Sequence, residues 1–134
     1  MSPESAFQLA TPATMPRSVG YSQLAAVSGG RLIFIAGQVA LDTHGNVVGL
    51  GDVRAQARQV FENLRAAVES VGGSFRDVIK LNTYFLDSAA LSDFRAIRDE
   101  YVDTANPPAS TAVQVSRLFR PEFLLEVEAI AVVK

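Results

Sequence analysis

Two glutamates near the C-terminus are the side chains of this 134-residue sequence best placed to do chemistry. Glu126 and Glu128 alternate with branched apolar residues in segment 124–133, so in an extended strand both carboxylates lie on one face. An apolar setting raises the pKa of a carboxylate, which allows it to act as a general base or acid near neutral pH or to hold a water molecule. Alternatively, one or both glutamates pair with an arginine across a subunit boundary. The sequence alone leaves both interpretations open.

The composition excludes several common kinds of active site. Cysteine is absent and His44 is the only histidine, which removes thiolate nucleophiles, disulfides and Cys/His zinc sites. His44 lies in the turn-forming segment 42–46, and no GxSxG motif presents a serine beside a histidine. We therefore expect no metal and no organic cofactor, with any chemistry carried by carboxylates, hydroxyls, arginines, backbone groups or bound water.

The charge balance argues against nucleic acid as a partner. Twelve Lys and Arg residues against 14 Asp and Glu give a net charge of -2, so no strong positive field is available for a phosphate backbone. No segment reaches the roughly 18 uninterrupted apolar residues of a membrane span, and residues 1–17 lack the pattern of a signal peptide. We expect a cytoplasmic protein without a membrane partner.

The elements that must position the glutamates are strands and two helices within one domain, residues 1–134. Apolar residues at spacings of three and four predict a helix over 52–71, with Asp52 as N-cap and Gly72-Gly73 as its stop. A shorter helix is predicted from an Asp87-Ser88 cap through Tyr101. Alternating patterns predict strands over 7–9, 21–27, 31–39, 77–86, 110–115 and 124–133, the second and third joined as a β-hairpin by Ser28-Gly29-Gly30.

This order predicts an α+β fold with one mixed sheet and two helices packed on one face. The opposite face is then open, yet both faces of strand 124–133 carry apolar residues. The chain is also 49% apolar and only 19% charged, against about 25% charged in typical domains. A partner subunit is the simplest cover for the open face, and the alternative is cover by the chain's own loops.

Several segments resemble the RidA/YjgF family of reactive-intermediate deaminases, also known as L-PSP endoribonuclease-like proteins. The resemblance covers nearly the whole chain and is carried by Gly20-Tyr21-Ser22-Gln23, Ile35-Ala36-Gly37-Gln38-Val39, Gln56-Ala57-Arg58, Asn63-Leu64, Asp77-Val78-Ile79-Lys80, Pro107-Pro108-Ala109-Ser110-Thr111 and the ending Glu126-Val127-Glu128-Ala129-Ile130-Ala131-Val132. It implies a chorismate-mutase-like fold and a homotrimer whose sheets line a central barrel. It also implies clefts for small-molecule ligands between adjacent subunits.

The resemblance further implies which residues form the cleft. Glu126 matches the glutamate that holds the attacking water in deaminating members, and Tyr21 and Gly37 match two other cleft positions. The family's substrate-binding arginine is missing, because Ser110 stands in its place. Ser110 and Thr111 retain hydroxyl donors. Arg98, on the second predicted helix, is either a solvent-exposed residue or a cation that reaches the cleft from a new position.

Three functions follow from the resemblance. The first is hydrolytic deamination of a small imine or enamine to a carbonyl compound and ammonia, a reaction at a C–N bond, with Glu126 positioning the water. The second is a trimeric ligand-binding protein that lost or changed this activity together with the arginine, since a serine hydroxyl cannot replace a bidentate guanidinium. The third, endoribonuclease activity, conflicts with the net charge of -2.

Overall fold

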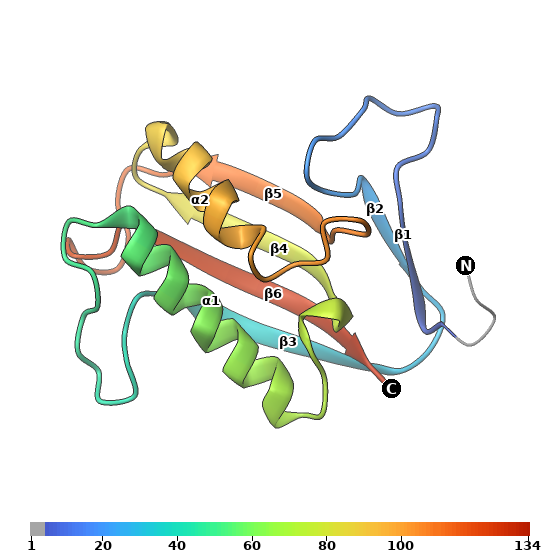
Figure 1. Ribbon diagram of the computed structural model, residues 1–134, viewed down its shortest axis with the longest axis horizontal. Helices are drawn as coiled ribbons and strands as arrows, with labels where there is room; N and C mark the ends of the chain where they lie inside the picture. The colour runs from blue at the N-terminus through green and yellow to red at the C-terminus, as the bar shows by residue number, and fades with distance from the viewer. Residues whose placement is uncertain (1–4) are drawn as a thin grey trace.

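The computed structural model describes residues 5–134, which form six strands, two α-helices and two short 3-10 helices (Figure 1). The strands are β1 (Phe7–Ala10), β2 (Leu24–Val27), β3 (Arg31–Gln38), β4 (Val78–Phe85), β5 (Ala109–Gln114) and β6 (Leu125–Val133). The helices are α1 (Val53–Ser70), α2 (Leu91–Arg98), η1 (Phe75–Asp77) and η2 (Ser88–Ala90). None of the helices within the described residues is both long and apolar enough to cross a membrane.

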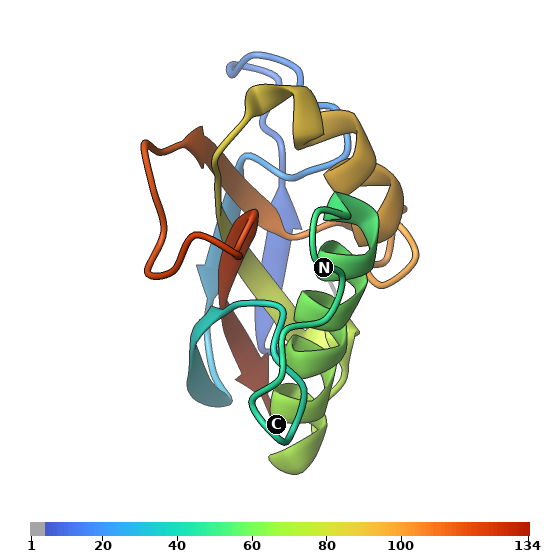
Figure 2. The ribbon, with the colours of Figure 1, turned by 90° about the vertical axis from the view of Figure 1, so that its left-hand side faces the viewer.

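The main sheet has four strands in the order β3-β6-β4-β5. β4 and β5 run parallel, whereas β6 is antiparallel to both β3 and β4. Both α-helices lie on one side of this sheet, as the two perpendicular views show (Figures 1 and 2). The prediction of an α+β fold with a mixed sheet and two helices on one face is confirmed for these residues.

The predicted β-hairpin between the second and third strands is wrong. β2 pairs antiparallel with β1, with Phe7 opposite Val27, and together they form a separate two-stranded sheet. β3 instead pairs with β6. The chain crosses from one sheet to the other at Gly30, whose φ is +78°. A Cβ at this position would lie 2.8 Å from a methyl carbon of Val132. The glycine pair does produce a turn, but the turn connects two sheets.

The bounds of α1 agree closely with the prediction, whereas α2 starts later and ends earlier than predicted. Oδ1 of Asp52 accepts a hydrogen bond from N of Ala55 at 3.1 Å, and Gly72 follows the helix with φ +87°. The cap predicted for the second helix, Asp87, belongs to η2, where its carboxylate accepts from N of Ala89. α2 therefore starts at Leu91, and it ends at Arg98 instead of continuing to Tyr101.

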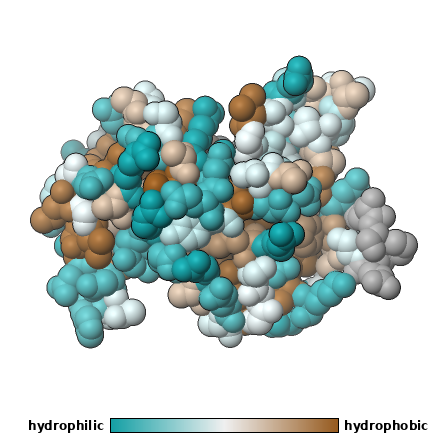
Figure 3. Space-filling view, viewed as in Figure 1, coloured by the Kyte–Doolittle hydropathy of each residue, from teal (hydrophilic) through white to brown (hydrophobic). Residues whose placement is uncertain are grey.

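The hydrophobic core lies between the helices and the sheet. Phe61 of α1 stacks on Phe94 of α2 and on Tyr101, with ring centroids 5.7 and 5.2 Å apart. The side chains of β6 that face the helices are buried, namely Leu125, Val127, Ala129, Ala131 and Val133. Hydrophilic side chains gather over the outer surface of the helices (Figure 3). Because both helices pack on the same face of the main sheet, they do not cover its other face.

The open face is apolar at its β3 side. Phe34 and Leu32 are 74% and 53% exposed there, opposite Ile130 and Val132 of β6. Burying large apolar side chains is worth about 1.5–3 kcal/mol each, so covering Phe34 and Leu32 would be favourable. The sequence-based expectation that this face keeps apolar residues agrees with the structure.

Candidate functional site

The sheet separates the predicted site residues into two groups on its two faces. Ser110 pairs in register with Leu81, which is buried beneath the helices, so the Ser110 side chain lies on the helix side. Thr111 pairs with Asn82 on the open face, where its Oγ1 accepts a hydrogen bond from Nζ of Lys80 at 2.8 Å. Thr111 therefore does not share a cavity with Ser110.

The two glutamates of β6 share the open face but differ in their partners. Glu128 accepts hydrogen bonds from the Tyr84 hydroxyl at 2.6 Å and from Nδ2 of Asn82 at 3.4 Å. Glu126 lies opposite Tyr84 in register, yet no side chain within residues 5–134 donates a hydrogen bond to its carboxylate. Glu126 is thus the carboxylate of the pair that is open to a water molecule or a ligand.

The negative charge on this face affects the pKa of Tyr84. The hydrogen bond to Glu128 raises the pKa of Tyr84, and burial and the charges of Glu128 and Glu126 raise it further. A neutral phenol is therefore favoured beside the two carboxylates, and it remains a donor to Glu128. The network holds Glu128 in place and leaves Glu126 as the available acceptor.

A bulge in β3 makes room for the Glu126 carboxylate. Ile35 pairs with Ala129 and Gln38 with Val127, so β3 has one residue more than β6 over this stretch. The extra length includes Gly37, where a Cβ would collide with the carboxylate of Glu126 and lie 3.1 Å from its Cγ. Gly37 also lines a hollow of about 400 Å³ at the β3 edge, beside Asn63.

The second group surrounds a cavity of about 230 Å³ between α2 and β5. Tyr21, Ser110 and Arg98 line it together with apolar side chains, among them Phe85 and Phe94. The structure thus brings together three of the residues predicted from the sequence. Glu126 and Gly37 of the same chain do not line this cavity.

Hydrogen bonds of Ser22 bring Tyr21 to this cavity. N of Ser22 donates to the carbonyl oxygen of Pro108 at 3.0 Å, and Oγ of Ser22 donates to that of Pro107 at 2.6 Å. Ser22 also forms a parallel bridge with Ala109, the first residue of β5. The segment before β2 is therefore fixed alongside β5, next to Ser110.

Arg98 is buried and not solvent-exposed. Only 4% of the residue is exposed, and its guanidinium pairs with Asp99 through Nε at 3.0 Å and Nη2 at 2.9 Å. Phe94, Ile97, Arg98 and Tyr101 follow the i, i+3, i+4, i+7 spacing of one helical face. That spacing is the sequence signal for the burial of Arg98, and solvent exposure was the wrong expectation.

Two amides of α1 position the segments that flank the site, a role the sequence pattern alone did not reveal. Nε2 of the fully buried Gln56 donates to the carbonyl oxygens of Gly49 and Glu122, and its Oε1 accepts from N of Leu124. Nδ2 of Asn63 donates to the carbonyl oxygen of Leu41 at 2.9 Å. Gln56 therefore fixes the entry to β6 two residues before Glu126. Its position among apolar residues of α1 was the available signal.

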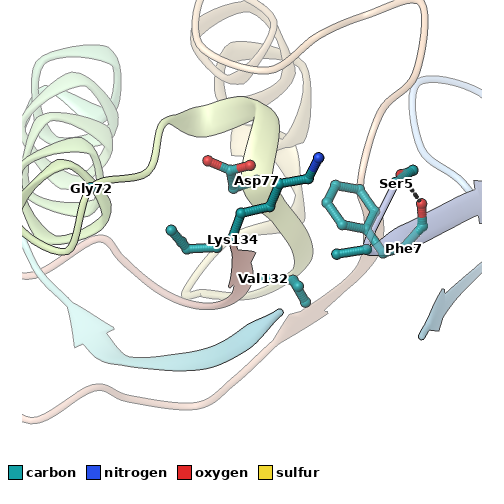
Figure 4. A pocket seen from close by; sticks show the side chains of 8 residues that line it. Ser5, Phe7, Gly72, Asp77, Val132 and Lys134 are labelled. Atoms are coloured by element: carbon teal, nitrogen blue, oxygen red, sulfur yellow. Dashed lines mark hydrogen bonds between the residues drawn. The ribbon is translucent and has the colours of Figure 1, made fainter. Parts of the chain in front are cut away.

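A larger cavity, of about 530 Å³, contains none of the predicted site residues. It lies at the start of β4 and the end of β6, and its lining includes Phe7, Asp77, Val132 and Lys134 (Figure 4). Oδ2 of Asp77 is engaged by N of Ser74 at 2.8 Å in a capping box. Across residues 5–134, no three His, Cys, Asp or Glu side chains are grouped so that they could hold a metal ion.

Comparison with known proteins identifies the class of this α+β fold. Residues 12–133 match the family model described as Endoribonuclease L-PSP. A RutC family protein of Pyrococcus horikoshii is 40% identical over 119 residues, which cover 87% of this chain and 90% of the relative. The 2-iminobutanoate/2-iminopropanoate deaminase of Dermatophagoides farinae is 33% identical over 123 residues, covering 89% of this chain and 91% of that protein.

Solved structures lead to the same class. The structure of YyfB from Yersinia pestis, a protein of the conserved Rid family, superposes with a TM-score of 0.89 at 34% identity and covers 96% of this chain and 100% of that one. E. coli TdcF with bound serine gives a TM-score of 0.69 at 30% identity, covering 95% of each chain. The chain belongs to the RidA/YjgF family, which includes imine deaminases.

Proposed function

We propose that this protein hydrolyses a small imine or enamine to a carbonyl compound and ammonia, in a cleft between the subunits of a homotrimer. The observation that carries the proposal is the Glu126 carboxylate, which receives no side-chain hydrogen bond within residues 5–134 and lies over the bulge at Gly37. Membership in a family with imine deaminases supports the same reaction.

The chemistry requires one base at the attacking water. Glu126 accepts a proton from water as the water oxygen bonds to the carbon of the protonated imine, which gives a carbinolamine, and Glu126 then returns this proton to the carbinolamine nitrogen. The C–N bond breaks, its electron pair leaves with ammonia, and the hydroxyl group gives its proton to the Glu126 carboxylate as the carbonyl forms. An enamine enters the same path after protonation on carbon. Glu126 is the catalytic residue of this proposal.

The division of the site residues between two groups favours a cleft shared by two subunits. The edges of the main sheet are β3, next to Gly37 and Glu126, and β5, next to Tyr21 and Ser110. A head-to-tail ring joins one edge of each subunit to the other edge of the next subunit. Such a ring brings both groups to one boundary, and its barrel would cover Phe34 and Leu32.

The enzyme assay is release of keto acid and ammonia from imines that an amino-acid oxidase generates in the same vessel. We expect the protein to accelerate release and Glu126→Gln to lose most of this acceleration. Glu128→Gln is the matched control, because its amide oxygen still accepts from Tyr84. Equal activity of Glu126→Gln and the unmodified protein would rule out the proposed role of Glu126.

One observation favours a second function, that of a ligand-binding protein without turnover. Ser110 stands on the helix side of β5 in place of the family's arginine. A folded protein that binds keto acids but does not accelerate imine hydrolysis would establish this second function.

A further inference from the structure

The cavity between α2 and β5 contains a buried cation with incomplete partners. Arg98 lines it and is 4% exposed. A guanidinium withdrawn from water is costly unless anionic or hydrogen-bonding partners replace the water. Its one acidic partner within residues 5–134 is Asp99, whose side chain is 45% exposed. The interaction therefore leaves part of the guanidinium available.

The unused part of Arg98 is Nη1. Asp99 engages Nε and Nη2, while Nη1 donates to no acceptor in the described part of the chain. The one enclosed side-chain polar atom without a partner among these residues is Oγ1 of Thr83, so Nη1 is not sealed inside the protein. Arg98 lines the cavity, so the cavity is an open space beside this side chain.

The surrounding chain is shaped to admit this side chain. Gly20 has φ +79°, and a Cβ there would lie 2.5 Å from Nη2 of Arg98. Ser110, on the same side of the sheet, is small enough to leave the cavity open. The absence of a side chain at position 20 and the small one at position 110 are therefore the local conditions under which Arg98 can occupy this place.

We propose that Arg98 binds the carboxylate of the substrate, so that the cation which the family carries on β5 is supplied here from α2. This proposal rests on the proposed deaminase function and narrows its substrates to small 2-imino acids. The carboxylate would bind at Nη1, beside the hydroxyls of Ser110 and Tyr21. The apolar part of the substrate would contact Phe85 and Phe94. Asp99 competes for the same guanidinium and limits affinity.

The kinetic test compares imines with and without a carboxylate. The 2-imino acid comes from an amino-acid oxidase and the neutral imine from an amine oxidase acting on an amine of similar size. We expect Arg98→Gln to raise KM for the 2-imino acid at least tenfold and to leave the neutral imine within about twofold, because only the first loses a charge-assisted contact. Arg76→Gln is the matched control, because the Arg76 side chain is 80% exposed and does not line this cavity. Equal losses in both arginine variants, or for both imines, would overturn the proposal.

A binding test separates this proposal from the deaminase function. Pyruvate, a 2-oxo acid that carries the same carboxylate, is titrated into the full-length protein by calorimetry. We expect Arg98→Gln to weaken binding at least tenfold and Asp99→Asn to strengthen it, because the competing carboxylate is removed. If neither imine is hydrolysed but pyruvate binds in this pattern, the deaminase function fails and Arg98 remains the anion site.

The test also needs variants that fold. Circular dichroism and thermal unfolding identify a variant that does not fold, and Arg98→Lys then replaces Arg98→Gln, since it keeps a charge but loses the planar guanidinium. Asp99 is partly exposed, so Asp99→Asn is expected to fold. Pyruvate binding that Asp99→Asn leaves unchanged or weakens would contradict the competition between Asp99 and the substrate.

Discussion

Gly37 lies directly under the carboxylate of Glu126, so close that any side chain at position 37 would collide with it. The close approach depends on the bulge between Ile35 and Gln38, which bends β3 next to Glu126. The backbone at Gly37 is not in the left-handed region, so the requirement for glycine here is one of space.

We therefore expect Gly37→Ala to impair activity more than stability. The added methyl displaces the carboxylate that positions the water, and a misplacement of about 1 Å can cost on the order of 100-fold in rate. Overpacking of this kind costs about 1–3 kcal/mol in the free energy of unfolding. Gly29→Ala is the control, because a Cβ there meets nothing within 4 Å. Imine turnover and urea denaturation of both variants are the measurements, and unchanged turnover in Gly37→Ala would refute the close approach.

The positions of most strands and helices were predictable from the sequence, but the pairing of the strands was not. Periodicity located α1 and its Asp52 cap, because both depend on residues within one segment. The turn at Gly29 and Gly30 was also visible, but the partner of β2 depends on β1, some twenty residues earlier. A local pattern therefore predicts a turn without revealing which strands it joins.

The sequence named the members of the proposed site but not the face of the sheet on which each one lies. Glu126, Tyr21, Gly37 and Ser110 were named from the sequence and stay a prediction as site residues, and their division between two faces required the register of the sheet. Arg98 needed the packing of α2 to reveal its burial.

Gln56→Ala is expected to destabilise the fold near the entry to β6. The amide satisfies the carbonyls of Gly49 and Glu122 and N of Leu124, and buried polar groups left without partners cost about 1–3 kcal/mol. We expect a loss of about 2–4 kcal/mol in the free energy of unfolding. Gln59→Ala, which removes a single hydrogen bond to Asn63 within α1, should cost about 1 kcal/mol. Denaturant titrations measure both, and similar losses would contradict the role of Gln56.

Stability is expected to fall at alkaline pH because of Tyr101. Burial and the hydrogen bond to Glu62 raise the pKa of Tyr101 to about 12, against about 10 in an unfolded chain. The folded state therefore holds this proton more tightly, and the stabilisation is complete below pH 10 and is lost as the pH rises toward 12. Tyr101→Phe keeps the stacking on Phe61 and should flatten this part of the profile. Denaturation at pH 8, 10 and 11.5 measures it, and an unchanged slope in the variant would contradict the assignment.

Phe34→Asp is expected to dissociate the proposed trimer. Phe34 is 74% exposed on the open face of a single chain, and a carboxylate buried in a subunit contact without a partner is costly. Light scattering at micromolar concentration should give the mass of three chains for the unmodified protein and that of one chain for the variant. Ala96→Asp, on the exposed side of α2, should remain trimeric. A single-chain mass for the unmodified protein would count against the trimer itself.

Ser110→Arg has different expected effects with and without Arg98. Both side chains belong to one cavity of about 230 Å³, so a second guanidinium beside the first is opposed by like charge and by lack of space. Ser110→Arg alone should therefore give little gain in turnover of 2-imino acids. In an Arg98→Gln background the new arginine has more room and no buried cation beside it, since the other arginine that lines the cavity, Arg95, is exposed. It should recover at least part of the lost affinity for the carboxylate.

The unmodified protein, Ser110→Arg, Arg98→Gln and the double variant form a double-mutant cycle. Two residues that bind the same anion give non-additive effects in such a cycle. KM for the 2-imino acid and pyruvate affinity are the readouts, with light scattering to check that each variant keeps its assembly. Strictly additive effects, or no recovery in a folded Ser110→Arg/Arg98→Gln variant that still binds a neutral imine, would show that positions 98 and 110 do not serve the same anion.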